Sequence, residues 1–197
     1  MKICLFGGTF NPIHNGHLYI AQMALEQYRL GKVIFIPAYI PPHKRNKNII
    51  DPKDRMHMIR CSIKGNNAFT LSDIEIVRGG TSYSVDTLRS MKKIISENDE
   101  LFFLMGTDSM ADFHSWHQSQ EIVKLCKIIS YERPGCLYNE TLAGMGTLKK
   151  YFSRSIKGFP IAVSSSDIRK RIKNNINIKY IVPEKAEKYI KQKGLYL

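Results

Sequence analysis

The chain has 197 residues, of which 43% are hydrophobic and 24% are charged, so it can bury a core and is neither disordered nor of low complexity. Thirty Lys and Arg against 17 Asp and Glu give a net charge of +13 at pH 7, which favours anionic partners such as nucleotides and nucleic acids. The chain has no cleavable signal pattern and no apolar run of about 18 residues, which argues against a membrane span and predicts a cytoplasmic protein.

Strand and helix patterns alternate along the chain. The strands are expected at residues 2–6, 32–36, 71–77, 101–105 and 127–131. The helices are expected at residues 17–28, 51–63, 84–95, 119–125, 166–174 and 183–191. This alternation predicts a Rossmann-like, doubly wound α/β fold with a mainly parallel sheet. We expect a single domain over residues 1–197, with a small helical C-terminal portion from about residue 165.

The first expected strand is followed by the run GGTFNPIHNGH at residues 7–17, where a glycine-rich turn leads into a helix. Gly7 and Gly8 allow the backbone to approach a phosphate, and the start of the helix offers N–H groups to it. His14 and His17 can both point at one phosphoryl group and donate hydrogen bonds to it. The pair could instead bind a metal ion, but neither the Glu of an H-E-x-x-H motif nor a third ligand accompanies it.

Three further segments could form the walls of a site. The basic loop at residues 41–48 follows a strand, although it could simply be solvated. The run GGTSYSVDTL at residues 79–88 gathers hydroxyl groups that suit a small carboxylate, or that merely cap a helix at Ser84. Asp108 follows the strand expected at residues 101–105, and Trp116 is the only tryptophan. Its indole suits stacking on a planar ring, although a single Trp is more often part of a core.

A second candidate phosphate site is the run VSSSDIR at residues 163–169, which precedes a basic helix. Serines at this place cap the helix or offer their hydroxyls to an anion, and Arg169 can add a charge-assisted hydrogen bond. The alternative is an ordinary helix cap followed by a solvated Arg.

Taken together, these motifs resemble the HxGH nucleotidyltransferases, and among them the nicotinate mononucleotide adenylyltransferases. The opening of that family, G-G-T-F-D-P-x-H-x-G-H, is matched from Gly7 to His17, except that Asn11 replaces the usual Asp. The family's T-S-Y and G-x-D segments, the Trp after them and the I-S-S-T-x-I-R segment near the end are also resembled, in this order. Phosphopantetheine adenylyltransferase, a related enzyme, usually has Thr in place of the first histidine and lacks the T-S-Y segment.

The resemblance implies a role for individual residues. It assigns the binding of ATP to Gly7, Gly8, Thr9, Phe10, His14, His17, Lys44, Asp108, Ser165, Ser166 and Arg169. It assigns catalysis to His14, His17 and Arg169. It assigns the binding of nicotinate mononucleotide to Thr81, Tyr83, Trp116 and Arg133.

The implied reaction joins ATP and nicotinate mononucleotide to give deamido-NAD and pyrophosphate, with Mg²⁺ carried by ATP and no metal site of the protein's own. No nucleic acid or membrane partner is expected, and the sequence does not distinguish a monomer from a homodimer. One alternative is a related enzyme that uses nicotinamide mononucleotide or phosphopantetheine. Another is a nucleic-acid-binding protein, which the net charge of +13 and the basic residues 169–173 suggest but no recognisable binding motif supports.

Overall fold

The structure, a computed structural model, describes residues 1–42, 49–153, 155–159 and 161–197. In this part of the chain, five strands form one sheet in the order β3-β2-β1-β4-β5, and every neighbouring pair is parallel. The strands are β1 (Lys2–Gly8), β2 (Lys32–Pro37), β3 (Phe69–Leu71), β4 (Glu100–Gly106) and β5 (Lys127–Tyr131). The predicted doubly wound α/β fold is confirmed.

The strands are connected by helices, as expected for a parallel sheet. The α-helices are α1 (Asn15–Gln27), α2 (Pro52–Ile63), α3 (Ile74–Arg78), α4 (Ser84–Lys92), α5 (Thr107–Ala111), α6 (Ser119–Leu125), α7 (Tyr138–Ala143), α8 (Ser165–Lys173) and α9 (Glu184–Lys193). The described residues also form two 3₁₀ helices, η2 (Phe113–Ser115) and η3 (Gly146–Tyr151). The short helices α3, α5 and α7 and both 3₁₀ helices were not predicted from the sequence.

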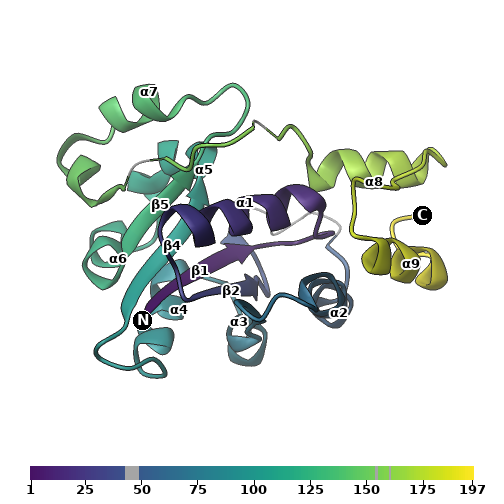
Figure 1. Cartoon of the computed structure of the whole chain (residues 1–197), viewed down its shortest axis with the longest axis horizontal. Helices are drawn as coiled ribbons and strands as arrows, with labels where there is room; N and C mark the ends of the chain where they lie inside the picture. Colours follow the sequence, from purple (N-terminus) through teal and green to yellow (C-terminus); the bar gives the residue numbers. More distant parts are fainter. Residues whose placement is uncertain (43–48, 154, 160) are drawn as a thin grey trace.

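Both faces of the sheet are buried, because successive side chains of a strand point to opposite faces. In β1, Cys4 and Phe6 join a core cluster with apolar residues of α1, α2, α8 and α9. Ile3 and Leu5 join a second cluster with apolar residues of α4 and α6. The apolar runs that predicted the strands from the sequence are therefore the middle layer of a three-layer fold, and Figure 1 shows α1 lying over one face of the sheet.

The chain reverses its direction across the sheet between β1 and β4. From β1 it proceeds outward to β2 and β3, and then it crosses to the other side of β1 to form β4 and β5. The loops that leave the carboxyl ends of β1 and β4 therefore diverge, and a crevice is expected between them. Figure 1 shows α8 and α9 beyond the arrowheads of β1 and β2, at the same edge of the sheet.

The prediction of a strand over residues 71–77 was wrong, because β3 ends at Leu71 and residues 74–78 form α3. The run Ile74-Glu75-Ile76-Val77 is rich in β-branched apolar residues, which is typical of a strand. In the structure the polar residue of this run is buried and an apolar one faces solvent, since Glu75 is 6% exposed and Val77 is 77% exposed. Glu75 is buried because Oγ1 of Thr87 in α4 donates a hydrogen bond to its carboxylate at 2.5 Å.

The other expected strands and helices are present, with β5 and α6 at the expected bounds and the ends of the others within three residues of the expected ones. For example, α4 ends at Lys92 instead of residue 95, and α1 begins at Asn15 instead of residue 17. None of the helices in the described part of the chain has both the length and the apolar character needed to cross a membrane.

Candidate active site

A cavity of about 370 Å³ lies at the carboxyl ends of β1 and β4, where the strand order reverses. Its walls come from the loop after β1, the start of α5, the loop after β5 and the start of α8. The lining residues are Phe6, Gly7, Gly8, Thr9, Phe10, Asn11, His14, His17, Ala38, Pro41, Pro42, Ile49, Asp108, Ser109, Trp116, Tyr131, Arg133, Ser164, Ser165, Ser166 and Arg169. All the residues predicted to bind ATP are among them except Lys44, which lies outside the described residues.

The loop after β1 is folded tightly over its own aromatic side chain. Phe10 has a φ of 47°, in the left-handed region that non-glycine residues seldom adopt. Its ring is 2% exposed and lies edge-on to Phe6 and to His17, with centroid separations of 5.6 and 4.9 Å. A Cβ atom on Gly8 would lie 3.0 Å from the Phe10 ring. A side chain at this position would therefore press on the buried Phe10 ring, which favours glycine here.

The two histidines lie against each other at the start of α1. Their rings are stacked, with centroids 3.6 Å apart. The backbone N–H of His14 donates a hydrogen bond to Nδ1 of His17 at 3.1 Å. Because Nδ1 accepts this bond, the neutral His17 ring carries its proton on Nε2 and can act as a donor there.

His14 is held in its neutral form. Its side chain is almost fully buried, and this burial, together with the positive charge of Arg133, lowers the pKa of His14 from 6.5 to about 4. At neutral pH the His14 ring is therefore uncharged, and the arginines Arg133 and Arg169 bring positive charge to the cavity that both histidines line.

The start of α8 is bound directly to the loop after β1. Oγ of Ser165 donates a hydrogen bond to the carbonyl of Pro12 at 2.9 Å. Nη1 of Arg169 donates to the carbonyl of Asn11 at 2.8 Å, and its Nη2 lies 3.3 Å from Oγ of Ser166. The two phosphate sites that the sequence predicted at opposite ends of the chain thus form adjacent walls of one cavity.

The helix cap of α8 is a different serine from the two predicted to bind ATP. Ser164 is the N-cap residue, and its Oγ accepts a hydrogen bond from the backbone N–H of Asp167 at 3.1 Å. The alternative interpretation, in which a serine of this run only caps the helix, is therefore correct for Ser164. It does not hold for Arg169, whose guanidinium group contacts the loop after β1 instead of extending into solvent.

The loops after β4 and β5 meet on the opposite wall. Nε of Arg133 lies 3.7 Å from a carboxylate oxygen of Asp108. Oγ1 of Thr107 accepts a hydrogen bond from the backbone N–H of Arg133 at 2.9 Å and donates one to the carbonyl of Cys136 at 2.6 Å. Thr107 therefore fixes both loops, and Arg133 lines the same cavity as His14.

Two smaller cavities adjoin the main one at Trp116, which lines all three. One, of about 140 Å³, lies between the ends of β1 and β4, and Glu75, Ser82 and Ser84 contribute to its walls. The other, of about 330 Å³, is lined by Tyr83 and Trp116 among others. The indole of Trp116 lies edge-on to Phe103, at a centroid separation of 6.2 Å, so the core supports this side chain while it also borders the cavities.

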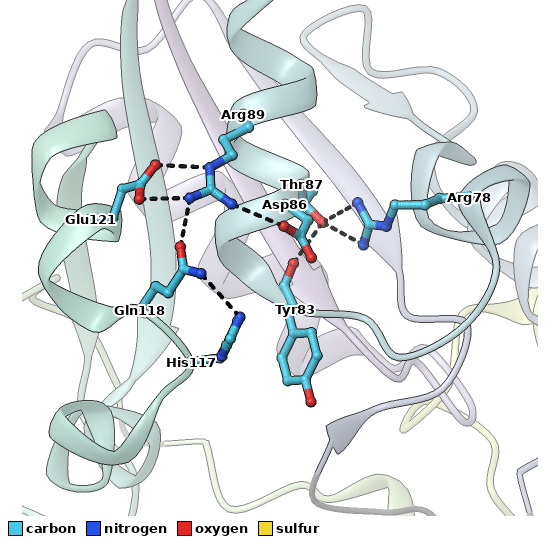
Figure 2. Close-up of polar contacts among 8 residues, drawn as sticks. All are labelled: Arg78, Tyr83, Asp86, Thr87, Arg89, His117, Gln118 and Glu121. Carbon is cyan, nitrogen blue, oxygen red and sulfur yellow. Dashed lines mark hydrogen bonds and ion pairs between the residues drawn. The ribbon is translucent and has the colours of Figure 1, made fainter.

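A polar network, drawn in Figure 2, joins α4 to residues 117–121, which directly follow Trp116 in the sequence. Arg89 of α4 donates to both carboxylate oxygens of Glu121 in α6, at 2.8 and 2.6 Å, and also to Oε1 of Gln118 at 2.5 Å. Nε2 of Gln118 lies 3.3 Å from Nε2 of His117, whose ring packs 4.5 Å from that of Tyr83. The network therefore links α4 to the wall of the cavity that Tyr83 lines.

Comparison with known proteins agrees with this geometry. Residues 5–171 match the family described as Cytidylyltransferase-like. A protein of Geotalea uraniireducens (strain Rf4) named "Probable nicotinate-nucleotide adenylyltransferase" is 39% identical over 100% of this chain and 98% of its own length. A protein of Thermoanaerobacter sp. (strain X514) with the same name is 36% identical over 100% of this chain and 94% of its own.

The chain belongs to the nicotinate-nucleotide adenylyltransferase family. The fold is also that of a solved structure of Plasmodium falciparum nicotinic acid mononucleotide adenylyltransferase complexed with NaAD. The two chains are 20% identical with a TM-score of 0.76, over 99% of this chain and 97% of the other. The resemblance inferred from the motifs is thereby confirmed.

In this member of the family, Thr81 lies beside the cavities and is not among the residues that line them. Its backbone is bridged to Ile40, and the backbone N–H of Ser82 donates to the carbonyl of Ile40 at 2.9 Å. This short pairing turns the side chains of Ser82 and Ser84 into the cavity between β1 and β4. Sequence reasoning missed these two serines, although both lie within the predicted run at residues 79–88.

Sequence reasoning also missed a buried arginine behind the loop. Arg55 is fully buried, and its Nη1 and Nε donate to the carbonyls of Thr9 and Ile50 at 2.9 and 3.2 Å. Burial lowers the pKa of its guanidinium group. Arg55, Met58 and Ile59 form one buried stripe of α2. Their helical spacing is the signal in the sequence that could have placed Arg55 on the core side of this helix.

We expect the buried, neutral state of His14 to appear in the pH dependence of stability. The pKa of His14 is about 4 in the folded chain against 6.5 for an unperturbed His, so the unfolded chain binds more protons between these pH values. The free energy of unfolding should therefore decrease as the pH falls from 7 to 4, by about 2 to 3 kcal/mol from this residue.

Urea unfolding of the parent chain and of His14→Gln at several pH values measures this contribution. The variant should show a weaker pH dependence between pH 6.5 and 4, because Gln does not titrate. Identical slopes for the two proteins would contradict the neutral, buried state of His14.

Proposed function

We propose that this chain transfers the adenylyl group of ATP to the phosphate of nicotinate mononucleotide, releasing pyrophosphate and forming deamido-NAD. One observation carries the proposal: the histidine loop after β1, the start of α8 and the cavities around Trp116 adjoin one another at a single edge of the sheet. A triphosphate and an aromatic acceptor could therefore be bound side by side. The names of the relatives, which are 36% to 39% identical over the whole chain, support the same reaction.

The proposed ATP site is the main cavity. The backbone of Gly7 to Phe10, the first turn of α8 with Ser165 and Ser166, and the side chain of Arg169 surround it. A glycine-rich turn and a helix start both present N–H groups to phosphate oxygens. We assign His14, His17 and Arg169 to the charge that develops on the departing pyrophosphate, and Asp108 to the nucleotide. Lys44 keeps the phosphate role that the family resemblance implies.

No general base is needed for this reaction. The attacking group is a phosphate oxygen of the mononucleotide, and phosphate monoesters are mostly dianionic at neutral pH because their second pKa is about 6. Catalysis should then come from the placement of two anionic groups and from the stabilisation of developing charge. Neutral histidines suit this purpose, since they donate hydrogen bonds and do not need to exchange protons.

Mg²⁺ is proposed to enter with ATP, held mainly by its phosphates and by water, because this ion usually keeps several waters and takes few protein ligands. Among the described residues, no three His, Cys, Asp or Glu side chains are grouped to hold a metal ion. Among the described residues that line the main cavity, Asp108 is the acidic one, and its side chain is 56% exposed, so it fits a site with one carboxylate and bound water.

The proposed site for the pyridine ring lies at Trp116 and Tyr83, with Thr81 and Arg133 as further contacts of the mononucleotide. Trp116→Ala is expected to raise KM for the mononucleotide by about tenfold, since stacking on an aromatic side chain contributes about 1 to 3 kcal/mol per base. KM for ATP should change by less than about threefold. Steady-state kinetics with each substrate varied in turn measure both constants.

Trp116→Phe is the matched control for this prediction. It keeps an aromatic face and should recover most of the affinity for the mononucleotide. A Trp116→Ala enzyme that is impaired only towards ATP would contradict the placement of the ring.

The partners proposed are ATP and nicotinate mononucleotide, in the cytoplasm, with the chain acting as a monomer or a homodimer. The release of pyrophosphate tests the proposed function. The purified chain with ATP and Mg²⁺ should release pyrophosphate when nicotinate mononucleotide is added and nucleic acid is absent. Phosphopantetheine and choline phosphate should not replace the mononucleotide. Release that requires either of these compounds, or that requires nucleic acid, would overturn the proposal.

A further inference from the structure

Asn11 lies at the centre of the contacts that hold the loop after β1. Its side chain is 3% exposed, and the residue lines the main cavity. Its main-chain carbonyl accepts the hydrogen bond from Nη1 of Arg169 at 2.8 Å. Any movement of the Asn11 peptide would therefore move an anchor of the Arg169 guanidinium group.

The side chain of Asn11 is in turn fixed by Tyr196, a residue 185 positions away in the sequence. Oη of Tyr196 lies 3.0 Å from Oδ1 of Asn11. The backbone N–H of Ile50 lies 3.4 Å from the same oxygen. Because a backbone N–H can only donate, the atom that faces Ile50 must be the carbonyl oxygen of the amide, and the Tyr196 hydroxyl must then be the donor to it.

The chain around Tyr196 is folded to bring this hydroxyl inward. After α9, Gly194 has a φ of 60° and the backbone N–H of Leu195 donates to the carbonyl of Ile190 at 3.0 Å. Tyr196 itself has a φ of 69°, which is unfavourable for an aromatic residue and needs compensating contacts. Burial raises the pKa of its hydroxyl, and so keeps it protonated as a donor, beside the guanidinium groups of Arg55 and Arg169.

We propose that Tyr196 is a positioning residue for catalysis, whose hydroxyl fixes the side chain of Asn11 and, through the Asn11 carbonyl, the Arg169 guanidinium group. This inference rests on the proposed function, in which Arg169 contacts phosphate. The segment after α9 then completes the phosphate site, although it contributes no residue to the lining of the cavity.

The test compares Tyr196→Phe with Tyr189→Phe. Tyr189 lies in α9, and its hydroxyl donates to Asp54 in α2 at 2.7 Å, so the control also loses one tyrosine hydrogen bond but makes none to the loop. We expect Tyr196→Phe to lower kcat by about tenfold, which is less than the roughly hundredfold that a misplacement of about 1 Å can cost. KM for the mononucleotide should stay within about threefold of the parent value, and Tyr189→Phe should retain the parent kcat.

The same substitution in an Arg169→Ala background separates positioning from general loosening of the fold. If Tyr196 acts through Arg169, Tyr196→Phe should lower kcat there by less than about twofold, because the group that it positions is already absent. An unchanged kcat in the parent background would overturn the proposal. An equal loss in both backgrounds, or an equal loss in Tyr189→Phe, would also overturn it.

Hydrogen exchange tests the contact between Tyr196 and Asn11 without any substrate, so this contact can be judged even if the proposed reaction fails. Backbone amides of residues 9–18 should exchange faster in Tyr196→Phe than in the parent and in Tyr189→Phe. Unchanged exchange of this segment would overturn the proposal that Tyr196 holds the loop after β1. A parent chain that releases no pyrophosphate would instead refute the proposed function and leave the exchange result valid.

Discussion

Replacing His17 with Ala is expected to lower kcat by roughly 10² to 10³, the loss found when one donor to a developing oxyanion is removed. His17 lines the main cavity, and its Nδ1 accepts the hydrogen bond from the backbone of His14, which leaves the proton on Nε2. A donor fixed in this way stabilises the departing pyrophosphate more than it stabilises bound ATP. The loss should therefore fall on kcat more than on KM for ATP.

Two variants make this prediction specific. His17→Gln can place an amide N–H near the position of the lost Nε2–H, and it should recover part of the activity. His57→Ala is the matched control, because the His57 ring is stacked on Tyr189, at a centroid separation of 4.1 Å, and does not line the cavity. The control should keep the parent kcat. A His17→Ala enzyme whose kcat stays within about threefold of the parent would show that the assigned role is wrong.

The second large effect is expected in the choice of acceptor. Nicotinate mononucleotide carries a ring carboxylate, whereas nicotinamide mononucleotide presents an NH₂ group at that place. A site that offers mainly N–H and O–H donors prefers the acid, because donors that face donors repel each other. Sites built to hydrogen-bond one group discriminate by up to about 10⁴ to 10⁵, and a partial mismatch gives less. We expect kcat/KM to favour the acid by at least about a hundredfold.

The cavity beside Trp116 contains a hydroxyl group that favours the acid and a carboxyl group that disfavours it. Ser84 lines the cavity beside Trp116 and can supply an O–H donor, whereas the hydroxyl of Ser82, which lines the same cavity, is hydrogen-bonded to Glu75. Glu75 lines the same cavity and would repel a second carboxylate. Burial raises the pKa of the Glu75 carboxyl, while the hydrogen bonds from Thr87 and Ser82 and the positive charge of Arg78 act in the opposite direction.

Measurement of kcat/KM for both mononucleotides at saturating ATP decides between these effects. Ser84→Ala should lower the ratio of kcat/KM for the acid to kcat/KM for the amide, if the Ser84 hydroxyl faces the ring carboxylate of the substrate. Equal use of the acid and the amide by the parent enzyme would refute the placement of the pocket. A preference for the amide would show that Glu75, and not the hydroxyl groups, determines the choice.

The parts of the fold that could be predicted from sequence are those whose signal is local. The buried strands are apolar runs, and Gly or Pro follows several of them. The loop after β1 is a contiguous motif whose glycines and histidines all lie within eleven residues. The serines and the arginine of α8 were recognised for the same reason. Only the structure shows that these two segments touch, through Ser165 and Arg169.

The features that were missed depend on contacts between distant residues. The segment around Glu75 was misread because its β-branched neighbours fit a strand, while the burial of Glu75 depends on a hydrogen bond from Thr87 in another helix. Arg55 and Tyr196 support the loop from α2 and from the segment after α9, and nothing near either residue in the sequence indicates a phosphate site. Short helices such as α5 and α7, with five and six residues, are also too short to give a periodic pattern.

The central claim is that a phosphate oxygen of the mononucleotide attacks the α-phosphorus of ATP within this cavity. The most direct test uses nicotinate mononucleotide whose phosphate oxygens carry oxygen-18, with mass analysis of both products. The account predicts that deamido-NAD retains all the labelled oxygens and that pyrophosphate carries none, because the bond that breaks lies between the α- and β-phosphates of ATP. Label in pyrophosphate, or ATP consumption without a dinucleotide product, would contradict it.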